Sequence, residues 1–156
     1  MMFPYRKLFL RDRATGDIDL ILRPEAPVTM HGPSWSMTCS GLVDTGSDTT
    51  IVPASLGREL GVTLVPSRRQ GTGFGGHLSD FFVGEIDLEI PLEESSARWR
   101  VTVNFVEFAT ESNEILILGQ AGFLEFFRAT FDWDKARLTL TANRRLGAIQ
   151  RKQKRG

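Results

Sequence analysis

The residues best suited to chemistry lie in one short segment, Leu42-Val43-Asp44-Thr45-Gly46-Ser47-Asp48. Two large apolar residues lead into an aspartate and a glycine follows two positions later, which predicts a carboxylate at a tight turn after a buried strand. We expect the hydroxyl groups of Thr45 and Ser47 to hold this carboxylate, and Gly46 to let another backbone approach. An Asp-Thr-Gly turn alone is typical of protein surfaces. The apolar residues on both sides indicate that this one is anchored in a core.

This segment resembles the active-site motif of the aspartic proteases, and among them the single-domain retroviral-type enzymes, the retropepsins, and their bacterial relatives. A second match is Ile115-Leu116-Ile117-Leu118-Gly119, which ends 75 residues after Asp44 and is followed by Phe123-Leu124. In that family the apolar-apolar-Gly segment threads beside the Asp loop, and a short helix packs below it. The matches keep the family's order over about residues 38–133.

The resemblance implies an aspartic endopeptidase that works as a homodimer. Hydrolysis in this family needs two carboxylates about 3 Å apart, which share one proton and activate a water between them. The sequence contains one Asp-Thr-Gly, so Asp44 of each subunit is expected to meet its partner at a two-fold axis. Thr45 then takes the family's cross-subunit hydrogen-bonding role, and Gly46 bonds the substrate backbone. Ser47 and Asp48 are expected to contact an extended peptide or protein substrate.

A glycine-rich segment between the two motifs lies where the family places its flap. Four glycines fall within residues 71–76, and we assign the flap tip, with contacts to substrate, to Gly73, Phe74, Gly75 and Gly76. A hairpin tip that opens and closes over a peptide needs small residues and free backbone amides. The alternative is a plain flexible hairpin loop.

Two departures from the family's pattern concern the surroundings of the motif. Retroviral enzymes carry an arginine after the apolar-apolar-Gly segment, which pairs with the acidic residue four after the catalytic aspartate. Here Asp48 is present, Gln120 stands at the arginine position, and Arg6 is a candidate partner for Asp48. Retroviral enzymes also close their dimer with a sheet of both chain termini, whereas this chain ends in a basic tail.

Two other functions use the same residues. A catalytically silent, protease-like dimer would serve as a peptide-binding or interaction scaffold, although a scaffold has no need of a buried carboxylate. Asp44-x-Gly46-Ser47-x-Thr49 also resembles the phosphate-binding hairpin of actin-like and sugar-kinase ATPases. Those folds need two lobes and far more residues than this chain has.

No metal or cofactor is expected. The two histidines, His31 and His77, are 46 residues apart with no cysteine or glutamate clustered beside them, which argues against a metal site or a Ser-His triad. The single cysteine, Cys39, excludes a disulfide framework, and we interpret it as a small core residue.

Short apolar or alternating runs broken by Gly, Pro and Asp favour strands over helices. The predicted strands span residues 5–11, 18–23, 38–43, 50–52, 81–90, 99–108, 114–118, 129–133 and 136–141, and short helical segments are predicted at 54–60 and 120–127. The pattern predicts an all-β fold, and the resemblance specifies a closed acid-protease barrel, retropepsin-like, with one or two short helices.

Charge divides the chain into two parts. Six of the 19 basic residues lie from Arg144 onward without an acidic residue, so residues 1–143 carry 13 basic and 19 acidic residues. We therefore expect a protease-like domain over 1–143 and a flexible basic tail over 144–156, which solubilises the chain, touches an anionic partner or serves as a processing site. The balance argues against nucleic acid as a partner of the domain.

Length and hydropathy bound the remaining classes. With 156 residues, 41% of them hydrophobic, the chain has the size and composition of one globular domain. Its N-terminus meets charge within six residues, and its apolar runs are far shorter than the roughly 20 residues that cross a bilayer. We expect a cytoplasmic protein without a membrane partner.

Overall fold

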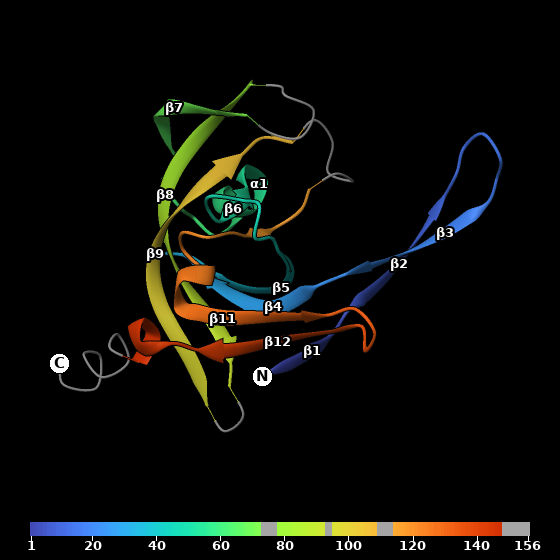
Figure 1. The fold of residues 1–156 in the computed structure, drawn as a ribbon. Coiled ribbons are helices and arrows are strands. Elements are labelled where there is room, and N and C mark those ends of the chain that lie inside the picture. Colours follow the sequence, from blue (N-terminus) through green and yellow to red (C-terminus); the bar gives the residue numbers. More distant parts are fainter. Residues whose placement is uncertain (73–77, 93–94, 109–113, 148–156) are drawn as a thin grey trace.

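The computed structural model describes residues 1–72, 78–92, 95–108 and 114–147, and most of them lie in strands (Figure 1). The strands are β1 (Met2–Pro4), β2 (Arg6–Arg11), β3 (Ile18–Arg23), β4 (Glu25–His31), β5 (Ser36–Val43), β6 (Ile51–Pro53), β7 (Val65–Thr72), β8 (Leu78–Pro91), β9 (Ser96–Val106), β10 (Ile117–Leu118), β11 (Phe127–Asp132) and β12 (Arg137–Ala142). The helical elements are α1 (Ala54–Glu59), the 3-10 helix η3 (Leu124–Phe126) and one turn at residues 144–147.

Six strands close into a barrel. Their order is β4-β5-β10-β6-β9-β8, and β8 pairs back onto β4 through the register Met30 with Leu88. β7 extends the sheet beyond β8. The predicted fold class, an all-β closed barrel with short helices, is confirmed.

Alternation along the strands builds the core. In β9 the side chains of Ala97, Trp99, Val103 and Phe105 are buried, while the residues between them face outward or are half-buried. Trp99 is fully buried against three phenylalanines from the segment after β10, at ring-centroid distances of 6.1, 5.4 and 5.8 Å from Phe123, Phe126 and Phe127. The indole Nε1–H donates to the main-chain oxygen of Gly122 at 3.0 Å. This aromatic cluster fixes the segment that follows β10 onto β9.

A second sheet joins the two ends of the described chain. Its order is β1-β12-β11, with Phe3 opposite Leu138, and the amino group of Met1 donates to the main-chain oxygen of Leu140 at 3.1 Å. The sheet of terminal strands is thus formed within one chain. The helical turn after β12 buries Leu146 completely in the same core.

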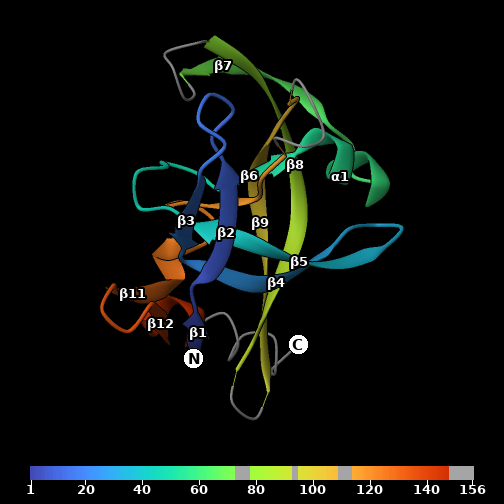
Figure 2. The ribbon, with the colours of Figure 1, turned by 90° about the vertical axis from the view of Figure 1, so that its right-hand side faces the viewer.

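The strands β2 and β3 form a separate two-stranded ribbon. Figure 1 shows it projecting from the body, and Figure 2 shows it in front of the barrel. The predicted strands at 5–11 and 18–23 are confirmed within one residue, and Gly16 takes φ +80° in the turn between them.

Most other predicted elements are also found, some of them longer and some shorter than predicted. α1 begins and ends close to its predicted limits, and Gly61 after it has φ +77°, as expected for a residue that ends a helix. The predicted strand at 114–118 is reduced to β10, and the helix predicted at 120–127 is the three-residue η3. β4, which contains Pro27, was not predicted because its apolar residues are interrupted by proline and polar residues. Among the described residues, no helix has the length and apolar character needed to cross a membrane.

Candidate active site

Asp44 lies in the turn between β5 and β6, at the point where β5 leaves the barrel wall. Gly41 and Val43 of β5 are buried, so the strand is anchored in the core up to the residue before the aspartate. Asp44 itself is half-buried, and Thr45 and Gly46 are exposed. The strand therefore delivers the carboxylate to the surface on a fixed base.

The main chain of the turn holds the carboxylate. The amide of Gly46 donates to Oδ1 of Asp44 at 2.8 Å, and the amide of Ser47 donates to the main-chain oxygen of Asp44 at 3.4 Å. The expectation that the Ser47 hydroxyl holds the carboxylate is wrong, because its Oγ donates to the main-chain oxygen of Thr49 at 2.8 Å. Ser47 stabilises the turn instead.

β10 threads between the two strands that flank this turn. Ile117 pairs with Leu42 of β5 in parallel and with Ile51 of β6 in antiparallel register. The amide of Asp44 donates to the main-chain oxygen of Leu118 at 3.2 Å. The arrangement that the resemblance implies for the apolar-apolar-Gly segment is present in this chain.

The close backbone approach occurs at Gly119 rather than at Gly46. A Cβ at Gly119 would overlap the main-chain oxygens of Thr49 and Ser47, whereas a Cβ at Gly46 would meet only Oδ1 of Asp44, at 3.2 Å. Within this chain the close approach is made at Gly119, and the approach of a substrate backbone to Gly46 stays a prediction.

Residues after Gly119 hold the loop from its other side. The side-chain amide of Gln120 donates to the main-chain oxygen of Thr45 at 2.9 Å. The main-chain amide of Gln120 donates to the main-chain oxygen of Ser47 at 2.8 Å. The amide of Ala121 donates to the main-chain oxygen of Asp48 at 2.9 Å. Gln120 thus bonds directly to the loop from the position where the family carries arginine.

Asp48 is exposed, and Arg6 is not its partner. Arg6 pairs instead with Glu25 of β4, at 3.2 Å between Nη1 and Oε2, and the Glu25 side chain is only 5% exposed. Since Glu25 sits next to the base of the ribbon, the pair stabilises the start of β2 and not the aspartate loop.

Beneath the loop, β9 supplies one further support. Nδ2 of Asn104 donates to the hydroxyl of Thr49 at 2.9 Å, and its main-chain amide donates to the oxygen of Thr50 at 3.2 Å. Asn104 faces the same side of β9 as the exposed residues, and its polar side chain was not singled out in the sequence. The alternation of β9 does mark it as outward-facing, but only the pairing of β6 with β9 places it under Thr49.

The predicted flap tip, Gly73, Phe74, Gly75 and Gly76, lies outside the described residues, as does His77. The strands on either side of it, β7 and β8, are antiparallel up to the pair of Thr72 with Leu78. The assignment of the tip to substrate binding stays a prediction.

The phosphate-binding hairpin is not what the loop forms. A hairpin requires its two strands to pair with each other, whereas β10 lies between β5 and β6. The resemblance to the ATPase motif is therefore limited to its residue types.

The remaining candidates serve the fold. His31 contacts Ser36 through Nδ1 at 2.7 Å and Glu89 through Nε2 at 2.8 Å. Cys39 packs against the core, and burial raises the pKa of its thiol to about 11. In the part of the chain that the structure describes, no three His, Cys, Asp or Glu side chains are grouped to hold a metal ion.

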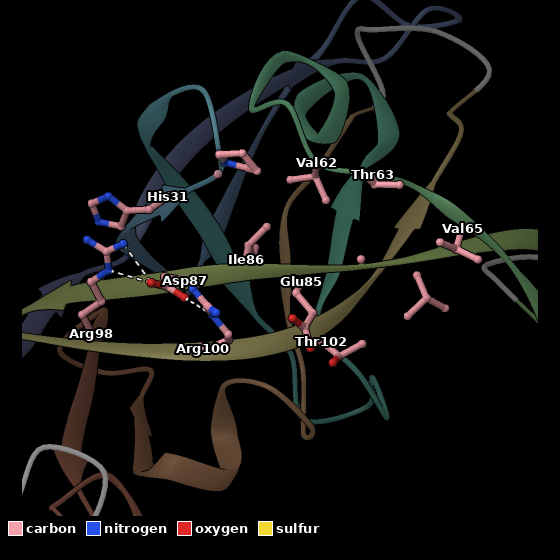
Figure 3. A pocket seen from close by; sticks show the side chains of 14 residues that line it. His31, Val62, Thr63, Val65, Glu85, Ile86, Asp87, Arg98, Arg100 and Thr102 are labelled. Carbon is pink, nitrogen blue, oxygen red and sulfur yellow. Dashed lines mark hydrogen bonds and ion pairs between the residues drawn. The ribbon is translucent and has the colours of Figure 1, made fainter. Parts of the chain in front are cut away.

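A groove of about 790 Å³ lies away from Asp44, and no residue of the 44–49 turn lines it. It runs along β8 and β9 against the segment 62–65 (Figure 3). Asp87 accepts hydrogen bonds there from Nη2 of Arg98 at 2.8 Å and from Nε of Arg100 at 2.9 Å. Burial raises the pKa of Asp87, but these bonds outweigh it, so the net pKa is lowered. The alternation of residues in the sequence predicts that Asp87, Arg98 and Arg100 face outward. It does not predict the register of β8 and β9 that brings the three side chains together.

No family model and no curated protein matches the sequence. Among solved structures, the chain is similar to EIAV protease complexed with the inhibitor HBY-793, with 18% sequence identity and a TM-score of 0.46. The similarity covers 62% of this chain and 81% of that chain. At this level, the similarity does not assign the chain to a family.

Proposed function

We propose that this chain is the subunit of a homodimeric aspartic endopeptidase in which Asp44 is the catalytic carboxylate. The observation that carries the proposal is the turn of Asp44, held by its own Gly46 amide on one side and by the segment Leu118–Gln120 on the other. A half-buried carboxylate with a fixed position and access to solvent is what acid–base work on a water requires.

The surroundings of Asp44 favour catalysis over a purely structural turn. The turn receives hydrogen bonds at three main-chain oxygens beyond Asp44, from Gln120 to Thr45 and Ser47 and from Ala121 to Asp48. None of these donors is spent on the carboxylate itself. Within the described residues the carboxylate of Asp44 accepts a hydrogen bond at Oδ1 alone, from Gly46, which leaves Oδ2 for a second carboxylate or a water.

The reaction follows from two Asp44 carboxylates sharing one proton. The ionised carboxylate takes a proton from the water between them as the water oxygen attacks the peptide carbonyl carbon. The protonated carboxylate gives its proton to the carbonyl oxygen, which yields a tetrahedral diol. The carboxyl group that took the proton of the water then gives it to the amide nitrogen as the C–N bond breaks, while the other carboxylate takes a proton from a diol hydroxyl, and a carboxylic acid and an amine leave. No cofactor takes part in these steps.

Thr45 and Gly46 are proposed as the supports of the two carboxylates, and Ser47 and Asp48 as contacts of an extended peptide. The exposure of Thr45 and Gly46 in one subunit supports this proposal, since both face outward at the turn where a second copy would approach. Substrate contacts by residues 73–76 belong to the same proposal.

The test is Asp44→Asn, which keeps the side-chain shape and removes the proton-accepting group. We expect cleavage of a broad peptide library by the wild type between about pH 3 and 7, inhibition by a pepstatin-like transition-state mimic, and loss of cleavage in Asp44→Asn. Asp134→Asn, a change at an exposed aspartate in the β11–β12 turn, is the matched control.

Cleavage retained by Asp44→Asn would overturn the mechanism. A wild type that dimerises and binds peptides without cutting any of them would favour the scaffold instead. Circular dichroism of both variants checks that a loss of activity is not a loss of fold.

A further inference from the structure

The β2–β3 ribbon exposes large apolar side chains that nothing in the described part of the chain covers. The exposed fractions are 69% for Phe9, 64% for Ile18 and 52% for Leu20, and Leu10 and Ile21 are exposed as well. An isolated two-stranded ribbon is marginally stable in water. A cluster of this kind marks a surface that binds a partner.

Both faces of the ribbon are apolar. Phe9 lies opposite Leu20, so these two share one face, while Leu8 lies opposite Ile21 on the other face. Residues two apart on a strand share a face, which adds Ile18 to the first and Leu10 to the second. A ribbon that is apolar on both sides fits between two surfaces or is wrapped by one.

Charge selects the kind of partner. The turn at the end of the ribbon carries Arg11, Asp12, Arg13 and Asp17, and such a charged tip does not enter a lipid bilayer. Residues 6–23 hold five basic and three acidic residues, whereas residues 24–143 hold eight basic and 16 acidic ones. The ribbon is therefore complementary in charge to the body of a second copy of its own chain.

Position and size also fit a second copy. The ribbon ends at Arg23, and the next two residues contact the strand that leads into the Asp44 turn, since the amide of Val43 donates to the main-chain oxygen of Pro24 and Glu25 pairs with Leu42. Six residues per strand give it a reach of about 20 Å. If both faces of both ribbons were covered, a symmetric dimer would bury about 1,600 Å² in total, which is the size of a standard stable interface.

We propose that the β2–β3 ribbon is an arm that packs on the body of a second copy of this chain, reciprocally in both subunits. This inference rests on the proposed function, because the aspartate pair of that function is incomplete without a second copy. The arm adds a contact outside the Asp44 turns and holds the two subunits together while the turns meet.

The experiment compares dimer dissociation constants of the full chain by sedimentation equilibrium. Phe9→Ser with Leu20→Ser removes one apolar face of the arm, and we expect the dissociation constant to rise by about tenfold or more. Trp35→Ser is the matched control, since Trp35 is also 69% exposed but lies outside the ribbon. A second variant replaces residues 7–22 by Asn-Gly, which is feasible because Arg6 and Arg23 are directly opposed.

The outcomes separate this inference from the proposed function. If the wild type dimerises and both arm variants dimerise equally well, the proposal that the ribbon is a dimerisation arm is contradicted and the peptidase proposal stands. If the arm variants become monomeric but the wild type cleaves no peptide, the arm is supported and the peptidase proposal falls. A wild type that is monomeric at high micromolar concentration, or that binds only vesicles through the ribbon, overturns the arm.

Discussion

The side-chain amide of Gln120 donates a hydrogen bond to the main-chain oxygen of Thr45, across 75 positions of sequence and at a distance of 2.9 Å. This bond joins the segment after β10 to the residue that follows Asp44. It makes Gln120 a positioning residue for the proposed reaction, since it acts on the carboxylate through the turn.

Gln120→Met, which keeps length and removes the donor, is expected to lower kcat about tenfold and to leave KM within about twofold, because the turn loosens without losing substrate contacts. Steady-state kinetics on one peptide measures the changes in kcat and KM separately. Gln120→Arg restores a donor and places a cation near Asp48, so it is expected to recover kcat. A proportional change of kcat and KM in all variants would contradict the positioning role.

Gly119→Ala tests the close approach of the two segments. The added methyl group overlaps the main-chain oxygens of Thr49 and Ser47, so the free energy of unfolding is expected to fall by about 2 kcal/mol or more. Urea denaturation measures it. Gly16→Ala is the control, because its methyl group meets no neighbour and only the positive φ opposes it, at about 1 kcal/mol. Equal losses in the two variants would show that the approach at Gly119 is not tight.

Asp87 gives the fold a contribution to stability that depends on pH. Its pKa is lowered in the folded state, because the bonds from Arg100 and Arg98 outweigh burial, so the contribution is present above the ordinary value of 3.8 and is lost as the pH falls through the lower folded pKa. At pH 7, Asp87→Asn is expected to reduce the free energy of unfolding by about 1 kcal/mol, a modest value because both arginines are largely exposed.

The difference between Asp87→Asn and wild type should narrow below about pH 4. Urea denaturation at several pH values measures it, with Glu59→Gln at an exposed position as the control. A difference that stays constant down to about pH 2 would mean that the carboxylate does not titrate against its arginines.

Leu146 tests where the folded domain ends. Its side chain is fully buried, and Asn143 before it donates through Nδ2 to the main-chain oxygen of Glu125 at 2.7 Å. Truncation after Asn143 is expected to lower the free energy of unfolding by about 2–4 kcal/mol, the range of a lost buried leucine. Truncation after Gly147 should leave it unchanged, and thermal denaturation distinguishes the two. If both truncations were neutral, the domain would end at residue 143.

The local pattern of the sequence predicted the elements, but not the contacts between distant ones. The alternation of residues 99–108 and the glycine after 54–60 each depend on neighbours in sequence, so β9 and the end of α1 were predictable. Glycine spacing could not show that Gly119, rather than Gly46, carries the close approach, since that depends on where β10 lies.

Side-chain partners were harder to predict for the same reason. From the sequence, Arg6 was a candidate partner of Asp48, but the position of β2 brings Arg6 to Glu25. The pairing of Asp87 with Arg98 and Arg100 depends on the register of β8 and β9, which charge alone does not fix. The position of Asp44 at the end of a buried strand was predictable, because apolar residues on both sides of a turn indicate that the turn is anchored in the core.

The position of β10 between β5 and β6 also has a consequence for the order of folding. β5 and β6 are separated by seven residues in sequence. Each of them pairs with β10, so neither can complete its pairing until this strand, which is synthesised more than 60 residues later, is inserted between them. Such long-range closure is slow compared with the formation of hairpins. A nascent chain therefore carries Asp44 for much of its synthesis without the segment that holds its turn in place. On this account, the proposed catalytic competence would arise only after residues 117–120 are synthesised and β10 is inserted between β5 and β6.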